Sequence, residues 1–552
     1  MRTYIRLLLA FALLSTALLC SSAVAQSPTP NQAGKLVVLI VVDQMRTDYL
    51  TRFDSLYTGG IARLARNGFV FGSAFHNHAH TETGVGHATI ATGSFPSRHG
   101  IVGNSWYDDS LSRLVYCSMD STAAITNHPD MEGRSPANLR SGGIADWLNR
   151  NQPESKVYAL SLKDRAAINM GSYSADGVYW YNSDNGKMIT SLFYTAVYPE
   201  WVAKLNDYHA ADDYYSGIWD RFAPLADYRF SGPDSVVNES DGKDIAFPHN
   251  FAPSADDSNA VFYDNLLATP FADHLLLRYA RELIKYEGLG QDEFVDLLMI
   301  SCSAADYVGH AYGPRSQEVQ DYYLRLDSYL GELFAELDST VGVDQYSIVL
   351  TSDHGVADFP EYQKSKGIDA GRIHPDSLNA AITNAVLVAA KSLGLKNNPI
   401  RRIDRGVYLD YSEADSLGIS NPALQDAIVT ELKRTPYIVD AYTTAELTAS
   451  GGTPRDYLQL FRNNYFPGRT AHVMYRLKEN YLVDRNSRGT THGSCYCYDT
   501  DVPIVFYGPA IKTSSSDRRI QTVDIAPTLV ELMGIFSAGE VDGQSQYQLI
   551  KK

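Results

Sequence analysis

Several short runs of this sequence are apolar at almost every position, and they constrain the fold more than any other feature. Three of them are Leu36 to Val42, Val295 to Ile300 and Ser347 to Leu350. A strand with one face in water alternates polar and apolar residues, whereas continuous apolar runs are typical of parallel strands buried between two helix layers. Val157 to Leu160 and Pro503 to Phe506 follow the same pattern. The runs therefore predict a buried, mostly parallel sheet.

Amphipathic segments lie between these runs. From Val319 to Leu337, apolar residues recur at helical spacing, with charged residues between them. Phe271 to Tyr286 has a similar pattern and is followed by Gly288, a typical helix C-cap. Asp524 and Pro527 are typical of a helix start. The alternation of strands and helices predicts an α/β fold, namely a three-layer αβα sandwich with a mostly parallel central sheet.

Two regions interrupt this alternation. Residues 194–267 are rich in Asp, Tyr, Ser and Pro, and residues 361–486 contain helix and strand patterns of their own. We expect both to be insertions in a single catalytic domain that spans residues 26–552.

The first residues are typical of an export signal. Arg2 and Arg6 precede the apolar run Leu7 to Leu19, and the small residues Ala23 to Ala25 provide a cleavage site. An uncleaved anchor is the alternative, although the run is short for a membrane span. We expect a signal peptide over residues 1–25, a periplasmic or secreted protein, and no stable membrane insertion.

The net charge restricts the partners that the chain can bind, and the cysteine content is compatible with export. The net charge of −17 becomes −19 once the two arginines of the leader are removed. Such an acidic chain does not suit nucleic acid or anionic membrane, and an anionic substrate would require local positive charge such as metal ions. Outside the leader, Cys117, Cys302, Cys495 and Cys497 could form one or two disulfides in an oxidising compartment.

Three of the predicted strands are followed by an aspartate. Asp43, Asp306 and Asp353 lie just beyond separate runs, where the carboxyl ends of parallel strands form ligand sites. Each alone is also typical of a turn or a helix cap. Three histidines accompany them: His310, His354 and His492. Mixed carboxylate and imidazole ligands suit zinc, and six side chains are enough for two ions.

A nucleophile and phosphate-binding groups can also be assigned. The segment His80 to Thr89 places Thr81 and Thr83 beside glycines at a predicted helix start, which favours an anion, and the pattern does not choose between them. Asn104 lies in a glycine-rich loop. Lys163 and Arg165 are two positions apart, so in an extended segment they would point the same way and converge on one dianion.

Together these motifs resemble the alkaline phosphatase superfamily, and in particular its phosphate-irrepressible branch of exported bacterial monoesterases with a threonine nucleophile. The resemblance runs from Asp43 to about Ile535. It implies an αβα sandwich with two zinc ions. It also implies that Thr83 is the nucleophile and a further metal ligand through its oxygen.

The resemblance assigns the other residues as well. It implies that Asp43, Asp353 and His354 bind the zinc ion that activates the nucleophile. A second set would bind the zinc ion near the leaving oxygen: Asp306, His310 and His492. A third set would hold the phosphoryl oxygens: Asn104, Lys163 and Arg165.

The predicted activity is hydrolysis of small-molecule phosphate monoesters through a phosphothreonine. The sequence does not determine the oligomeric state, and a monomer is compatible with it. The alternative is a phosphodiesterase or nucleotide pyrophosphatase on the same two-zinc site. A diester carries one negative charge and gains less from two cations, so Lys163 and Arg165 favour the monoester. A sulfatase would need a Cys or Ser in a different motif. A zinc- or phosphate-binding protein would not need Thr83.

Overall fold

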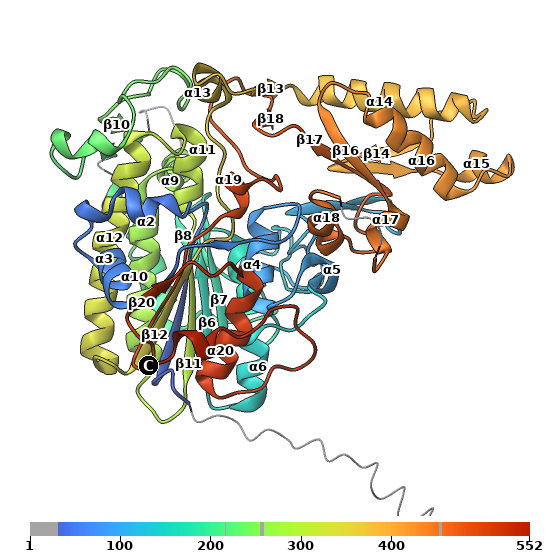
Figure 1. Cartoon of the computed structure of the whole chain (residues 1–552). Helices are drawn as coiled ribbons and strands as arrows, with labels where there is room; N and C mark the ends of the chain where they lie inside the picture. Colours follow the sequence, from blue (N-terminus) through green and yellow to red (C-terminus); the bar gives the residue numbers. More distant parts are fainter. Residues whose placement is uncertain (1–30, 216, 254–258, 452–454) are drawn as a thin grey trace, which may run out of the picture.

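A computed structural model describes residues 31–215, 217–253, 259–451 and 455–552 of the chain (Figure 1). The predicted signal peptide, residues 1–25, lies outside the described residues. In the part that is described, no helix is both long and apolar enough to cross a membrane.

The centre of the molecule is a nine-stranded sheet in the order β20-β2-β19-β12-β1-β11-β6-β7-β8. Neighbours from β12 to β7 pair in parallel. Four of these strands match predicted apolar runs: β12 (Tyr346–Thr351), β1 (Leu36–Val42), β11 (Asp296–Cys302) and β6 (Val157–Ser161). The fifth, β7 (Gly177–Asn182), was not predicted. The prediction of a mostly parallel, buried sheet is confirmed.

The flanks of the sheet contain antiparallel pairs. β19 (Ile504–Tyr507) runs antiparallel to β12 and to β2 (Phe69–Phe71), and β8 (Lys187–Ile189) runs antiparallel to β7. The expectation that the run at Pro503 to Phe506 would be a parallel strand was wrong. The segment before β19 contains His492, which lies among the residues at the carboxyl ends of the central strands. A strand that follows it directly therefore runs back through the sheet.

Helices cover both faces of the sheet. Along β1, Val38 and Ile40 pack into one apolar core, and Val37 and Leu39 pack into the other. The first core includes residues of α3 (Gly60–Asn67), α10 (Pro270–Glu287), α11 (Ala304–Tyr312) and α12 (Gln317–Leu337). The second includes residues of α6 (Ile144–Asn151), α7 (Asp164–Gly171) and α20 (Ile525–Met533). The predicted αβα sandwich is confirmed.

A smaller sheet lies to one side of the sandwich, near the carboxyl ends of its strands (Figure 1). It is antiparallel, in the order β14 (Ile400–Ile403), β15 (Gly406–Leu409), β17 (Val473–Leu477) and β16 (Ile438–Thr443). With α14 (Pro375–Ser392) and α16 (Asn421–Leu432) it encloses a separate apolar core. We call residues 375–477 the side lobe. The domain boundaries given above stay a prediction.

The stretch 194–267 contains only short elements. Those in its described residues are α8 (Glu200–Asp207), η2 (Ala210–Tyr214), β9 (Ile218–Trp219), η3 (Leu225–Phe230), β10 (His249–Asn250) and α9 (Asn259–Leu267). Trp219 anchors this stretch to the sandwich, since its indole nitrogen donates to Asp321 on α12 at 2.7 Å. Of the described cysteines, Cys117, Cys302 and Cys495 are buried and Cys497 is exposed, and none forms a disulfide.

Candidate active site

Four neighbouring parallel strands direct polar side chains to one edge of the central sheet. β1 ends at Asp43, and β12 leads into Asp353 and His354. β11 leads into α11, which carries Asp306, and β6 leads into Lys163. Because the carboxyl ends of parallel strands meet at one edge, residues separated by hundreds of positions in the chain share one site.

The first group of potential metal ligands is fully buried. One ligand atom from each of Asp43, Asp353 and His354 lies within 4.8 Å of the others. The Nε2 atom of His354 is 3.4 Å from an oxygen of each aspartate. Three atoms that point into the group have no hydrogen-bond partner in the described structure: Asp43 Oδ1, Asp353 Oδ2 and His354 Nε2. Buried polar atoms without partners are costly, and a bound cation would satisfy all three.

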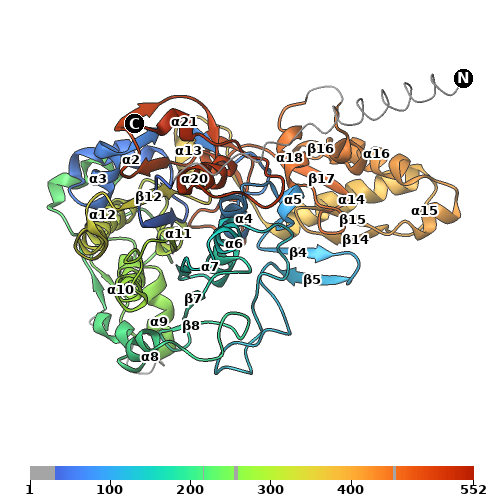
Figure 2. The same cartoon turned by 90° about the horizontal axis from the view of Figure 1, so that it is seen from below.

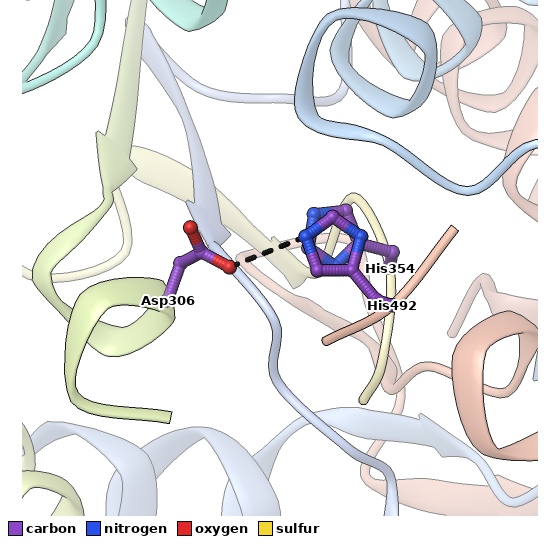
Figure 3. Close-up of side chains that lie close together, drawn as sticks. All are labelled: Asp306, His354 and His492. Atoms are coloured by element: carbon purple, nitrogen blue, oxygen red, sulfur yellow. Dashed lines mark ion pairs between the residues drawn. The ribbon is translucent and has the colours of Figure 1, made fainter. Parts of the chain in front are cut away.

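The second group is more open. Asp306, His354 and His492 also place ligand atoms within 4.8 Å of one another (Figure 3). Asp306 Oδ1 is 3.5 Å from His492 Nε2 and 3.1 Å from His310 Nε2. The side chain of His310 is 34% exposed. The rings of His354 and His492 are stacked 3.5 Å apart, so the two groups adjoin.

Backbone carbonyls orient all three histidine rings. The Nδ1 atoms of His310, His354 and His492 lie 2.7, 3.0 and 2.6 Å from the carbonyl oxygens of Thr490, Gly355 and Thr81. A carbonyl oxygen only accepts hydrogen bonds, so each Nδ1 carries the hydrogen. The lone pair of each neutral ring is then on Nε2, which faces the aspartates. This arrangement is typical of histidines that bind metal.

The aspartates repel one another in the absence of bound cations. Burial and the neighbouring Asp353 raise the pKa of Asp43 well above its ordinary value. Burial also opposes ionisation of Asp306, but His310 and Lys163 outweigh it and hold the pKa of Asp306 well below its ordinary value. Burial lowers the pKa of Lys163, but Asp306 and Asp43 outweigh it and raise that pKa. The carboxylate and imidazole donors at this edge fit divalent metal ions.

Thr83 is the first residue of α4 (Thr83–Thr92) and lies beside Lys163. Its Oγ1 is 3.5 Å from Lys163 Nζ, which is itself 2.6 Å from Asp43 and 2.5 Å from Asp306. The hydroxyl of Thr81 instead donates to the carbonyl of Ser494 at 2.7 Å. The geometry thus favours Thr83 over Thr81, a choice that the sequence pattern left open.

Close packing holds α4 against the first group. A Cβ on Gly86 would lie 2.2 Å from the carbonyl oxygen of Asp353, so only glycine permits this approach. One turn from Thr83, His87 Nδ1 lies 2.8 Å from the carbonyl oxygen of Thr83 and 3.3 Å from Asp353 Oδ2. The first turn of the helix is therefore fixed beside the metal ligands.

Two of the three predicted phosphate-binding residues contact Thr83 or its neighbour: Lys163 contacts Thr83, and Asn104 contacts Gly84. Asn104 Oδ1 accepts a hydrogen bond from the Gly84 N–H at 2.8 Å, which leaves the Asn104 amide N–H groups as donors. Lys163 and Arg165 line one cavity of about 240 Å³. They do not lie in an extended segment as expected, because Arg165 is in the first turn of α7. Its Nε atom is buried without a hydrogen-bond partner in the described structure, and so can donate to an anion.

Two residues of the site were not predicted. Gln44 donates from Nε2 to Asp306 Oδ1 at 2.5 Å and from its backbone N–H to Asp353 Oδ1 at 3.2 Å, so it contacts both groups. Its place directly after Asp43 is the only signal in the sequence. His87 lies in the same glycine-rich segment as Thr83, but nothing in that segment distinguishes it from a structural histidine.

An αβα sandwich with two acid-histidine groups at the carboxyl ends of its strands defines the metal-dependent phosphoesterases of the alkaline phosphatase superfamily. Comparison with known proteins gives the same class. The sequence profile of the type I phosphodiesterase / nucleotide pyrophosphatase family matches residues 37–470. The chain belongs to this family.

Its relatives in the family include alkaline phosphatases. The chain is 33% identical to alkaline phosphatase PafA of Elizabethkingia meningoseptica, over 94% of this chain and 95% of that protein. It is 32% identical to alkaline phosphatase PhoV of Synechococcus elongatus, with the same coverage. The crystal structure of PafA superimposes with a TM-score of 0.86 at 32% identity, covering 94% of this chain and 99% of that chain.

Proposed function

We propose that the protein is an exported alkaline phosphatase that hydrolyses phosphate monoesters through a phosphothreonine at Thr83. The observation that carries this proposal is the position of Lys163 Nζ, 3.5 Å from Thr83 Oγ1 and within 2.6 Å of Asp43 and Asp306. One cation thus links the predicted nucleophile to both metal-ligand groups. The two relatives named alkaline phosphatases support the same activity.

The residues at this edge would hold two zinc ions, one in each group of ligands. Asp43, Asp353 and His354 would hold the first ion with the oxygen of Thr83. Asp306 and His492 of the second group would hold the second, together with the adjacent His310. When bound, the ions supply positive charge that favours the ionised Thr83 hydroxyl and the departing ester oxygen.

The chain supplies the remaining steps. Thr83 Oγ1 releases its proton to solvent and attacks phosphorus, so that the Oγ1–P bond forms as the P–O bond to the alcohol breaks, and the departing oxygen takes up a proton from water. Asn104, Lys163 and Arg165 donate hydrogen bonds to the nonbridging oxygens, where negative charge is held during transfer. Water then attacks the phosphothreonine from the vacated side, releasing phosphate and restoring the Thr83 hydroxyl. Two in-line displacements predict net retention of configuration at phosphorus.

Specificity for monoesters over diesters depends on the cavity that holds Lys163 and Arg165. A monoester dianion offers three nonbridging oxygens to these cations, and a diester offers two and a single charge. The family also includes phosphodiesterases and nucleotide pyrophosphatases, so diester hydrolysis on the same site is the second candidate. The paired cations favour the monoester.

The rest of the proposal concerns location and partners. The basic start, apolar run and small-residue cleavage site support a signal peptide cleaved after Ala25, and therefore a periplasmic or secreted enzyme. The acidic net charge of −17 does not suit binding to nucleic acid. This one chain supplies all the side chains named in the site, so the proposed activity is compatible with a monomer.

Replacing Thr83 with Ala tests the proposal directly. Monoester turnover should fall by roughly 10⁴-fold or more, because alanine has no side-chain oxygen to form the bond to phosphorus. Zinc content, measured by elemental analysis, should stay near two ions per chain if both groups hold metal. Turnover retained in the Thr83→Ala variant would instead indicate Thr81 or direct attack by water.

A further inference from the structure

A charged residue of the side lobe reaches the loop that carries Thr83. Arg405 lies in the two-residue turn between β14 and β15, and it contacts Glu82 through two parallel hydrogen bonds. Arg405 Nε is 2.5 Å from Glu82 Oε1, and Nη2 is 2.9 Å from Glu82 Oε2. Glu82 is only 8% exposed. A bidentate, mostly buried pair fixes the relative position of its two segments more firmly than a surface ion pair does.

Glu82 connects this contact to two residues of the proposed mechanism. It directly precedes Thr83, and its Oε2 accepts a hydrogen bond from the backbone N–H of Asn104 at 2.7 Å. Asn104 Oδ1 in turn accepts from the backbone N–H of Gly84. The nucleophile and one proposed phosphate ligand are therefore joined by a closed set of hydrogen bonds that passes through Glu82.

Arg405 also holds the other side of the Asn104 loop. Its Nη1 donates to the carbonyl of Ser105 at 2.7 Å, and a Cβ on Gly103 would lie 3.0 Å from the same Nη1 atom. The backbone of Arg405 has φ 50, a left-handed conformation that residues other than glycine rarely adopt. Unfavourable backbone conformations of this kind are typical of functional positions that surrounding contacts over-determine.

We propose that Arg405 is a positioning residue for phosphoryl transfer, acting through Glu82 to set the distance between Thr83 and Asn104. The side lobe then contributes to catalysis by fixing the nucleophile loop, without contacting the phosphoryl group. This inference rests on the proposed function, because it assigns Thr83 and Asn104 to the same phosphoryl group.

The charge on Glu82 predicts the direction in which a second substitution should change the activity of an Arg405 variant. If Arg405 is removed, a mostly buried carboxylate is left unpaired next to the residue that receives an anionic substrate. Replacing Glu82 with Gln in that background removes the unpaired charge, and the amide oxygen of Gln can still accept from the Asn104 N–H. The second substitution should therefore restore part of the activity that the first removes.

A second ion pair between side lobe and sandwich provides a matched control. Arg401 Nη1 is 2.6 Å from Asp109 Oδ1, so it ties β14 to the turn between β4 (Ser105–Asp108) and β5 (Arg113–Tyr116), which extend beneath the side lobe (Figure 2). Arg401 contacts no residue of the proposed mechanism. Arg401→Ala removes a link of the same kind at a distance from Thr83.

The experiment compares full-length Arg405→Ala, Arg405→Lys, Arg405→Ala with Glu82→Gln, and Arg401→Ala. A phosphate monoester is the substrate, and zinc content and thermal unfolding are measured for each variant. Arg405→Ala should lower kcat by about 10- to 100-fold with zinc content near wild type, because small displacements of reacting groups cost about that much. Arg405→Lys should recover only part of the loss, Glu82→Gln should recover activity, and Arg401→Ala should retain wild-type kcat.

Epistasis with Asn104 separates positioning from loss of stability. In an Asn104→Ala background, Arg405→Ala should cost much less than it does in the wild type, because the residue it positions is already gone. Equal losses in the two backgrounds, or equal effects of Arg405→Ala and Arg401→Ala, would overturn the inference. Full turnover by Thr83→Ala would instead overturn the proposed function on which the inference rests.

Discussion

The two groups of metal ligands differ in how the fold builds them. Asp43, Asp353 and His354 follow the adjacent strands β1 and β12 and are completely buried. The second group shares His354 with the first, takes Asp306 from the first turn of α11 and His492 from a loop far along the chain, and has His310 beside it on the second turn of α11. The first group is thus fixed by the hydrogen bonds of the sheet, and the second by helix packing and a loop.

The two groups of metal ligands also differ in exposure to solvent, and this difference indicates that they have different roles in the reaction. The side chain of His310 is 34% exposed, and His492 lines a cavity of about 470 Å³ between the sandwich and the side lobe. A nucleophile must be held rigidly, whereas a leaving alcohol must depart into open space. The buried group therefore suits the side of Thr83, and the open group suits the side from which the alcohol leaves.

Replacing His354 with Ala is expected to have the largest effect, because its ring belongs to both groups. We expect zinc content to fall below one ion per chain and monoester kcat/KM to fall by roughly 10⁴-fold. Elemental analysis and initial rates measure both quantities. If one full zinc equivalent remained, the two groups would be more independent than their shared histidine implies.

Removing Lys163 and Arg165 together tests whether the substrate is a monoester. We expect the double Ala variant to lose roughly 10³-fold in kcat/KM toward a phosphate monoester and about 10-fold toward a matched diester, since the dianion gains more from the two cations. Paired rates on the two substrates measure this ratio. Equal losses would show that these residues do not select the monoester.

The parts of the site that the sequence predicts are those that follow regular structure. Asp43 comes directly after a run that predicts a buried strand, and Asp353 comes three positions after another. Parallel strands bring their carboxyl ends together. Asp306 and His310 lie at helical spacing after a third run. For these residues, local pattern and topology together were enough to predict that they meet.

Other residues could not be found in this way. His492 follows no strand, and only the resemblance to a known family assigned it to the second group. Arg405 lies 323 residues from Glu82, in an insertion whose packing against the sandwich depends on tertiary contacts. The predicted direction of β19 was wrong because an apolar run indicates that a strand is buried but not whether it is parallel or antiparallel to its neighbours.

Replacing His310 with Ala should have a smaller effect than any change to the buried group. Its ring is partly exposed, and Asp306, His354 and His492 still form a three-ligand group without it. We expect a loss of about 10- to 100-fold in affinity for the second metal ion, with the first ion retained. Titration with a competing chelator measures the two affinities separately. If both ions were lost together, the two groups would not bind metal separately, and the proposed difference between them would be wrong.

The smallest effect is expected from Gln44→Ala. Gln44 contacts both groups of metal ligands, but only its contact with the second group is made by the side chain. The side chain donates to Asp306, whereas the contact with Asp353 comes from the backbone N–H and survives the substitution. Alanine also keeps a Cβ, so the left-handed backbone at φ 65 is no more strained than before. The affinity for the second ion should fall by about 10-fold or less, because an outer hydrogen bond orients a ligand without replacing it. The same chelator titration should leave the first ion unchanged. If the affinity for the first ion also fell, the orientation of Asp353 would depend on the Gln44 side chain, and the buried group would be less rigid than its position after two paired strands implies.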